Sequence, residues 1–274
     1  METAYPSSGT AAGTNPALRR TTGPGPLEMV LVAGLAFFLN LSAGTLLQLA
    51  RPRLGLLLSE IFFIAAPAIL AIRLFYLDRG VILPLRGARF IDLIAAVAGA
   101  LGLNHLLTVA GAWQETVWPT PPVVRALFDG LFVYRGPLDF AALLVAFALV
   151  PAVCEEILFR GFLQAGLARA IQRPAGLLAV SALVFAVFHL DPWRFAGVTA
   201  LGLFLAWLRL ETGSLLPPMA AHAASNVLSI TLKSTGRLEV DATGSLWSAG
   251  VAAALAIAAI AAIAVGRRSR DRML

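Results

Sequence analysis

The chain contains eight stretches of about 20 predominantly apolar residues, and their length constrains the fold more than any other sequence feature. A helix needs about 20 such residues to cross the hydrocarbon core of a bilayer, since each residue advances it by about 1.5 Å. The stretches lie near residues 28–49, 54–77, 90–113, 137–171, 175–190, 195–210, 214–232 and 246–265. They predict an all-α fold, a polytopic transmembrane helical bundle of about eight spans.

Composition supports the membrane class and excludes two others. Apolar residues make up 59% of the chain and charged residues 13%, about half the charged share of an ordinary soluble domain. A soluble globule of this size could not bury so many apolar side chains, and a disordered chain needs the opposite composition. The net charge is +6, but the basic residues lie at the ends of apolar stretches, so we expect no nucleic-acid binding.

Outside the apolar stretches the sequence predicts little folded structure. Residues 1–26 are rich in Pro, Gly, Ser and Thr and are expected to form a disordered N-terminal tail. Residues 27–266 are expected to form one transmembrane domain, followed by a short basic tail at 267–274. A loop rich in proline and aromatic residues follows the third stretch, and a short interfacial helix is expected near residues 123–133.

The distribution of basic residues predicts the orientation in the membrane. With eight spans and a cytoplasmic N-terminus, 14 of the 21 basic residues fall on the inner side and 7 on the outer side. Cytoplasmic loops carry such an excess of Lys and Arg. We therefore expect both termini to be cytoplasmic.

The fourth apolar stretch contains an ionisable cluster, Glu155, Glu156 and Arg160. Ionisable side chains at membrane depth cost about 2.5–3.5 kcal/mol each, which makes a function the default hypothesis. Glu156 and Arg160 are four residues apart and should pair on one helix face, whereas Glu155 lies about 100° around the axis. We expect Glu155 to face a polar cavity, where it suits a general base. The alternative is an interfacial charge cluster where the helix leaves the membrane.

Two later stretches also carry polar side chains. His189 lies near the end of the fifth stretch, four residues after Phe185, and an interfacial histidine at a helix end would explain it equally well. His222 and Asn226 are one turn apart in the middle of the seventh stretch. Their alternative role is hydrogen bonding between helices. Together with Glu155, these residues on three successive segments form a candidate site.

The same residues carry a family resemblance. Glu155-Glu156-x-x-x-Arg160, then Phe185-x-x-x-His189, then His222-x-x-x-Asn226 resemble the three ordered motifs of the CPBP family. That family comprises the type II CAAX prenyl endopeptidases and the bacterial Abi, or bacteriocin-processing, proteins. The resemblance covers roughly residues 137–232, and the rest of the chain is similar only in being hydrophobic.

The resemblance implies an intramembrane endopeptidase that hydrolyses a peptide bond at or near the membrane surface. By analogy, Glu155 and His189 would activate a water molecule, and His222 and Asn226 would stabilise the oxyanion. Glu156, Arg160 and Phe185 would support these catalytic groups. The expected partners are a peptide or protein substrate and membrane lipid, and the expected location is the plasma or inner membrane of a prokaryote.

The resemblance leaves metal dependence open, because both metal-dependent and metal-free mechanisms have been proposed for the family. Glu155, His189 and His222 would supply a His2Glu zinc set with an open position for water. Against zinc, the chain has no HExxH sequence, and Asn226 is a better oxyanion donor than zinc ligand. We therefore expect no cofactor, with one divalent metal, zinc, as the alternative.

The site is geometrically possible only if the fourth helix is long. A span that ended at Arg160 would place Glu155 near one membrane face and His189 near the other. A helix over about residues 138–171 places Glu155 near its midpoint, with Pro151 one turn before it as a possible kink. We therefore predict a long fourth helix.

Other functions and residues are less well supported. A non-catalytic membrane scaffold or bacteriocin-immunity protein on the same fold is the main alternative, and a proton-coupled transporter would need inverted repeats that the sequence lacks. Cys154 is not expected to be a nucleophile, because an apolar site makes a thiol inert. Glu60 and the Asn104-His105 pair would line the cavity or be structural, and we assign them no role.

Overall fold

The computed structural model describes residues 23–85, 87–236 and 245–271, and every regular element within these ranges is helical. This confirms the all-α class. Of the predicted N-terminal tail, residues 1–22 lie outside the described residues, and the first helix already begins at Pro26. Of the predicted basic tail, residues 272–274 lie outside them, and the last helix continues to Asp271.

The expected apolar stretches all form helices, some of which contain π-helical turns (η). The first comprises α1 (Pro26–Leu39), η2 (Asn40–Gly44) and α2 (Thr45–Ala50), and the second comprises α3 (Pro52–Ser59), η3 (Glu60–Ala65) and α4 (Ala66–Leu74). The fourth comprises α8 (Pro137–Leu144), η4 (Val145–Leu149), α9 (Val150–Glu156), η5 (Ile157–Leu163) and α10 (Gln164–Ala170). The others are α6 (Phe90–Val117), α11 (Pro174–Phe188), α12 (Phe195–Thr212), α13 (Leu216–Ser234) and α14 (Ser245–Asp271), with the short helices α5 (Arg79–Ile82) and α7 (Pro122–Leu131).

Six of these helices in the described ranges are long and apolar enough to cross a membrane. They are Pro26–Ala50, Pro52–Leu74, Phe90–Val117, Pro137–Ala170, Phe195–Thr212 and Ser248–Arg267. The chain is therefore an integral membrane protein, but the expected count of about eight spans is not confirmed. Of the remaining two, α11 has only 15 residues, and α13 is less apolar because it carries histidine, asparagine, serine and lysine.

Proline marks where several helices begin. Pro26, Pro52, Pro122, Pro137 and Pro174 each occupy the first position of a helix. Proline fits there because its fixed φ is helical, and because an N–H group in the first turn would have no hydrogen-bond partner within the helix. These starts separate the apolar stretches into discrete helices.

The predicted long fourth helix is confirmed. It runs without a break over 34 residues, Pro137–Ala170, and Glu155 lies near its midpoint. The π-helical segments η4 and η5 flank the α-helical segment that carries the glutamates. Because π turns occur often at functional sites, this segment is where a site is expected.

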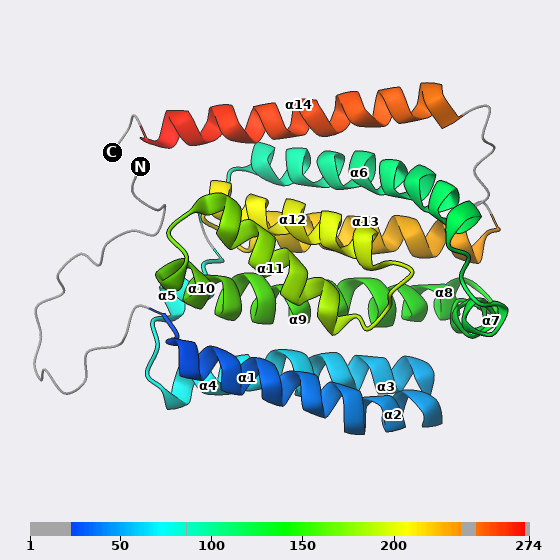
Figure 1. Cartoon of the computed structure of the whole chain (residues 1–274), viewed down its shortest axis with the longest axis horizontal. Helices are drawn as coiled ribbons and strands as arrows, with labels where there is room; N and C mark the ends of the chain where they lie inside the picture. The colour runs from blue at the N-terminus through cyan, green and yellow to red at the C-terminus, as the bar shows by residue number, and fades with distance from the viewer. Residues whose placement is uncertain (1–22, 86, 237–244, 272–274) are drawn as a thin grey trace, which may run out of the picture.

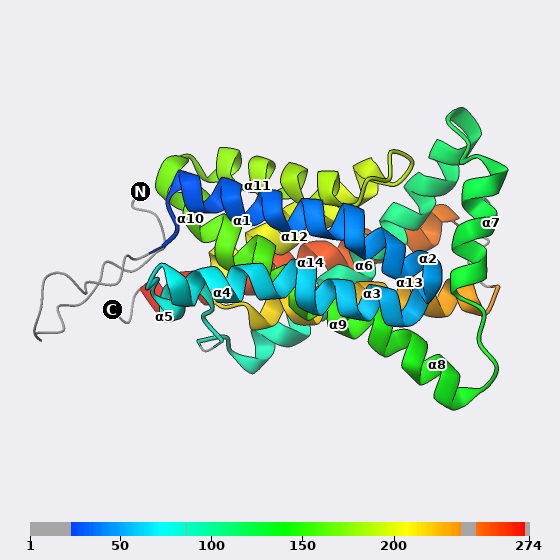
Figure 2. The same ribbon diagram turned by 90° about the horizontal axis from the view of Figure 1, so that it is seen from below.

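The fourth helix is central in the bundle (Figure 1). α1–α4 lie on one side of it, and α12, α13, α6 and then α14 lie on the other. α7 crosses one end of the bundle, nearly perpendicular to the long helices, with no buried residue (Figure 2). That position fits the interfacial helix expected near 123–133. The start of α1 and the end of α14 lie at the same end of the bundle.

Small residues let the helices around the site approach closely. A Cβ added to Gly102 of α6 would lie 2.6 Å from the Ala252 carbonyl oxygen of α14. A Cβ added to Gly202 of α12 would lie 3.1 Å from Cδ1 of Phe185 and 3.2 Å from Cα of Ala182, both on α11. Such contacts are typical of membrane helices, whose association depends on close packing. The second of them places the α12 backbone next to the candidate site.

Candidate active site

Glu156, Arg160 and His222 form a buried network between the fourth helix and α13. Oε1 of Glu156 accepts hydrogen bonds from Nη1 of Arg160 and from Nδ1 of His222, each at 3.0 Å. Both partners in the Glu156–Arg160 pair have fully buried side chains, and that of His222 is 3% exposed. The predicted pairing of Glu156 with Arg160 is thus confirmed. Complete burial excludes a solvated charge cluster at the membrane surface.

Arg160 is also held from two other directions. Its Nη2 donates to the Gly202 carbonyl oxygen at 3.2 Å, which the close approach of α12 makes possible. Its guanidinium lies over the ring of Phe185, 4.1 Å from the centroid. A cation over an aromatic face gains electrostatic energy, more when it is removed from water. Arg160 is therefore fixed by a carboxylate, a carbonyl and an aromatic ring.

Phe185 joins the three motifs physically. It is fully buried, and its ring also contacts the imidazoles of His189 and His222, at centroid distances of 4.7 and 5.8 Å. Both contacts are edge-to-face, a favourable geometry for aromatic rings. Phe185 thus sets the position of both histidines and of Arg160 relative to one another.

Glu155 faces the other nitrogen of His222. Its Oε2 lies 3.9 Å from Nε2 of His222, so this imidazole stands between the two adjacent glutamates. The Glu155 side chain is 13% exposed, and its Oε2 is buried without a hydrogen-bond partner among the described residues. A buried acceptor without a partner is costly, and such exceptions often mark functional groups. Glu155 is therefore available to a water molecule or a substrate.

His189 lies at the C-cap of α11, as the helix-end explanation of this residue predicts. Its Nδ1 donates to the Phe185 carbonyl oxygen at 2.9 Å, and the residue is exposed on the protein surface. Because a carbonyl can only accept, Nδ1 carries the hydrogen, and in the neutral ring Nε2 is an acceptor. Within the described residues His189 forms no hydrogen bond with Glu155 or His222. The shared contact with Phe185 is what links it to the network.

Asn226 lies one turn after His222 and is partly buried, without a hydrogen bond to another described residue. The polar contact between α6 and α13 is made by other residues. Nδ2 of Asn104 donates to Oγ of Ser225 at 2.9 Å and to Oγ of Ser229 at 2.8 Å. Asn104 is thus structural, and the carboxamide of Asn226 is not used in holding the helices together.

In the described residues, the three residues of the zinc alternative are not gathered into a metal-binding group. That alternative needs Glu155, His189 and His222 around one ion, but in the described parts of the chain no three His, Cys, Asp or Glu side chains form a group that could hold a metal. Each histidine uses Nδ1 in a hydrogen bond, to Glu156 or to a backbone carbonyl, which leaves Nε2 as the open nitrogen of each ring.

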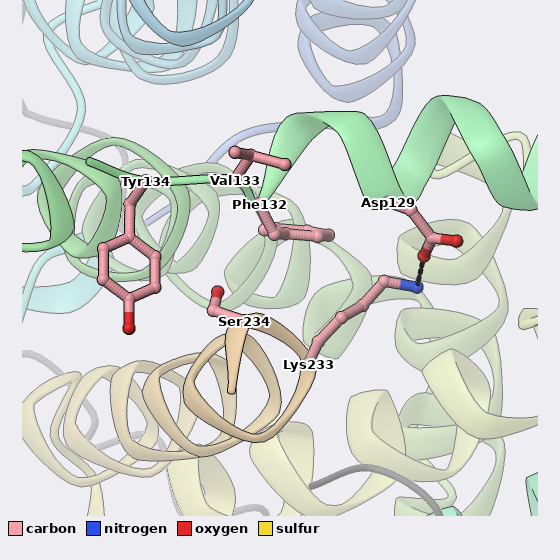
Figure 3. Close-up of a pocket in the computed structure, with 6 residues that line it drawn as sticks. All are labelled: Asp129, Phe132, Val133, Tyr134, Lys233 and Ser234. Carbon is pink, nitrogen blue, oxygen red and sulfur yellow. Dashed lines mark ion pairs between the residues drawn. The ribbon is translucent and has the colours of Figure 1, made fainter. Parts of the chain in front are cut away.

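Two hollows occur near the bundle. The larger, about 470 Å³, lies beyond the site at the far end of α13, next to the ion pair between Lys233 and Asp129 (Figure 3). Its lining residues are Asp129, Phe132, Val133, Tyr134, Lys233 and Ser234. The smaller, about 360 Å³, is apolar and is lined by η3, α4 and the fourth helix, including Cys154. Of these two hollows, the smaller is the one whose lining includes a sequence neighbour of Glu155, namely Cys154.

Glu60, for which the sequence indicates no role, also lies in this region. Glu60 of η3 is buried, and η3 packs against α9, the segment that carries Glu155. The signal was present, because Glu60 is the acidic residue of the second apolar stretch. The spacing within that stretch could not show which helix it faces.

Fold and site together define an integral membrane protein of helices with a buried cluster of Glu, Arg and His at its centre. Comparison with protein families finds one similar to the central part of the chain. Residues 137–228 match the model of the Type II CAAX prenyl endopeptidase Rce1-like family. The match extends from α8 into α13 and includes Glu155, His189, His222 and Asn226. It confirms the resemblance seen in the motifs and covers 92 of the 274 residues.

A search of curated proteins and a search of solved structures gave no match. The assignment therefore rests on the family match and on the site itself.

Proposed function

We propose that the chain is an intramembrane endopeptidase that hydrolyses a peptide bond at or near the membrane surface, with Glu155 as the general base. One observation carries the proposal. Oε2 of Glu155 is buried without a partner among the described residues and lies 3.9 Å from Nε2 of His222, inside the segment that matches the protease family. A carboxylate in this state is free to take a proton from water.

In the proposed reaction, Glu155 takes a proton from a water molecule as the water oxygen attacks the carbonyl carbon of the substrate. The new C–O bond moves an electron pair onto the carbonyl oxygen. Glu155 then returns its proton to the amide nitrogen, and the C–N bond breaks. The acceptor Nε2 of His189 would orient the attacking water, because its Nδ1 hydrogen is already committed.

The oxyanion would be stabilised by α13. Nδ2 of Asn226 and Nε2 of His222 would donate to it, the latter only if the ring carries hydrogens on both nitrogens. Loss of one oxyanion donor typically lowers kcat by about 10²–10³-fold. Glu156, Arg160 and Phe185 are positioning residues in this scheme, because they hold His222 and do not meet the substrate.

The proposal is tested by comparing the membrane peptidomes of cells that carry the intact protein and the Glu155→Gln variant. Products that disappear with the variant support the proposal and identify the substrate. His189→Ala and His222→Ala should have the same effect without loss of the folded protein. Glu115→Gln is the matched control, since Glu115, near the end of α6, pairs with the exposed Arg125 of α7. If all three site variants rescue a knockout phenotype, the non-catalytic scaffold or immunity function is favoured instead.

We also propose that the reaction needs no metal. Elemental analysis of purified, active protein measures this directly. Activity without bound zinc supports the proposal, whereas stoichiometric zinc that is lost together with activity overturns it.

We further propose that both termini face the cytoplasm of a prokaryotic cell. The start of α1 and the end of α14 lie at the same end of the bundle, as that orientation requires (Figure 1). The excess of basic residues expected on this side supports the cytoplasmic assignment. Reporter fusions at each terminus test it, and a periplasmic reporter signal at either terminus contradicts it.

A further inference from the structure

Glu60 is a buried acidic residue that the proposed mechanism does not use. It begins η3 in the second helix and is 6% exposed, and its Oε2 is buried without a hydrogen-bond partner among the described residues. The preceding Ser59 does not satisfy it, because Oγ of Ser59 donates to the Gly55 carbonyl oxygen at 2.7 Å. An unsatisfied carboxyl group at membrane depth destabilises the fold, so its presence calls for another explanation.

The position of Glu60 suggests that explanation. η3 packs against α9, the segment that carries both Cys154 and Glu155. Glu155 presents its own unpartnered Oε2 in the same region. Two helices therefore each contribute a buried carboxyl oxygen that lacks a hydrogen bond, and both oxygens are acceptors. A water molecule has two O–H groups and could donate one hydrogen bond to each of these two carboxyl oxygens.

We propose that Glu60 is a second water-binding group of the site. Its Oε2 shares one hydrogen of the nucleophilic water with Nε2 of His189 in a three-centre hydrogen bond, while the other hydrogen points to Oε2 of Glu155 and is the one transferred. Glu60 gains and loses no proton in this step, so the proton balance of the proposed hydrolysis is unchanged. This inference rests on the proposed function and adds the group that aims the water before attack.

A water-binding role and a structural role predict opposite effects on stability. If Glu60 acts only on water, its replacement by leucine removes an unsatisfied buried polar group, which is neutral or stabilising. If Glu60 holds the helices together, the same replacement lowers stability. Residues that lower stability but serve function are expected at active sites.

The experiment measures kcat, KM and thermal unfolding in detergent for Glu60→Leu, Glu60→Gln and the control Ser59→Ala. The substrate is the peptide identified by the Glu155→Gln peptidome comparison. We expect Glu60→Leu to lower kcat by about tenfold or more, the effect of one lost hydrogen bond, with KM within about twofold and Tm not lowered. Glu60→Gln keeps a carbonyl acceptor and should lose no more than about threefold. Ser59→Ala should match the wild type in kcat.

Two results overturn the inference while leaving the proposed function intact. One is a wild-type kcat for Glu60→Leu. The other is a joint loss of kcat and Tm in both Glu60 variants, which indicates a structural role. If the wild-type protein cleaves no peptide, the proposed function fails instead. In that case the water-binding role of Glu60 is tested without activity, by density maps that resolve water. A water molecule bonded to both Glu60 and Glu155 must be present in the wild type and absent in Glu60→Leu.

Discussion

Replacing Arg160 by methionine should destabilise the protein more than any other single change in the Glu156–His222 network. Methionine is similar in length to arginine and keeps the apolar packing over Phe185 but not the charge. The change removes the 3.0 Å bond to Glu156 and the 3.2 Å bond to the Gly202 carbonyl oxygen. His222 remains as a partner for Glu156, but the fully buried carboxylate loses its permanent cation.

The size of the effect follows from the burial of the pair. Both side chains of the Glu156–Arg160 pair have no exposed surface, so removing one partner leaves a charge in an apolar interior. Removing one member of a buried ion pair typically costs about 3–5 kcal/mol. For a chain of this size, about 2–4 °C of Tm corresponds to 1 kcal/mol, so Tm should fall by on the order of 10 °C.

The assay is thermal unfolding of purified protein in detergent, with the double variant Glu156→Gln/Arg160→Met as the decisive comparison. Because the double change removes both charges, it should be more stable than Arg160→Met alone. The control is Arg125→Met, which breaks an exposed pair with Glu115 and should cost less than about 1 kcal/mol.

Two outcomes would refute this reasoning. If Arg160→Met unfolds at the wild-type temperature, the buried pair does not stabilise the network. If the double variant is less stable than Arg160→Met, the penalty does not arise from an uncompensated charge. Either result would also remove the support for Arg160 as a positioning residue.

Three further substitutions test contacts around and beyond the site. Gly202→Val should cost about 1–3 kcal/mol in thermal unfolding, because even a Cβ there lies 3.1 Å from the Phe185 ring. Asn104→Leu should cost about 0.6–2 kcal/mol in denaturant titration, since it removes the hydrogen bonds between α6 and α13 that Asn104 donates to Ser225 and Ser229. Lys233→Ala should change stability by less than about 1 kcal/mol and leave the cleavage rate unchanged, because its ion pair is partly exposed and lies at the far end of α13.

The sequence predicted those features that depend on one helix alone. The Glu156–Arg160 pair was predictable because the two residues share a helix face at a fixed spacing. The length of the fourth helix was predictable because Glu155 cannot otherwise reach the other motifs. The number of spans was harder to predict from the sequence. α11 has only 15 residues and α13 carries polar side chains, so neither helix meets the criterion of about 20 predominantly apolar residues.

Contacts between helices could not be predicted from the sequence. Nothing in the spacing places Nδ1 of His222 on Glu156, since that depends on the rotation of α13 relative to the fourth helix. The same holds for the Gly202 carbonyl, a backbone group that no side-chain motif marks. Glu60 was visible as an acidic residue in an apolar stretch, but only packing of η3 on α9 shows which residues it faces.

The π-helical segments of the fourth helix change the direction in which side chains point before and after them, although the helix is continuous. A π turn takes up more residues than an α turn, so η5 rotates everything after Leu163 relative to the glutamates before it. Gln164, the first residue beyond η5, donates to the Ala206 carbonyl oxygen of α12 at 3.0 Å and depends on that rotation. Deleting one residue from Ile157–Leu163 would leave Glu155 facing His222 but turn Gln164 away from α12. The number of residues in this segment, and not only their identity, is therefore a constraint on any engineered or natural variant of the chain.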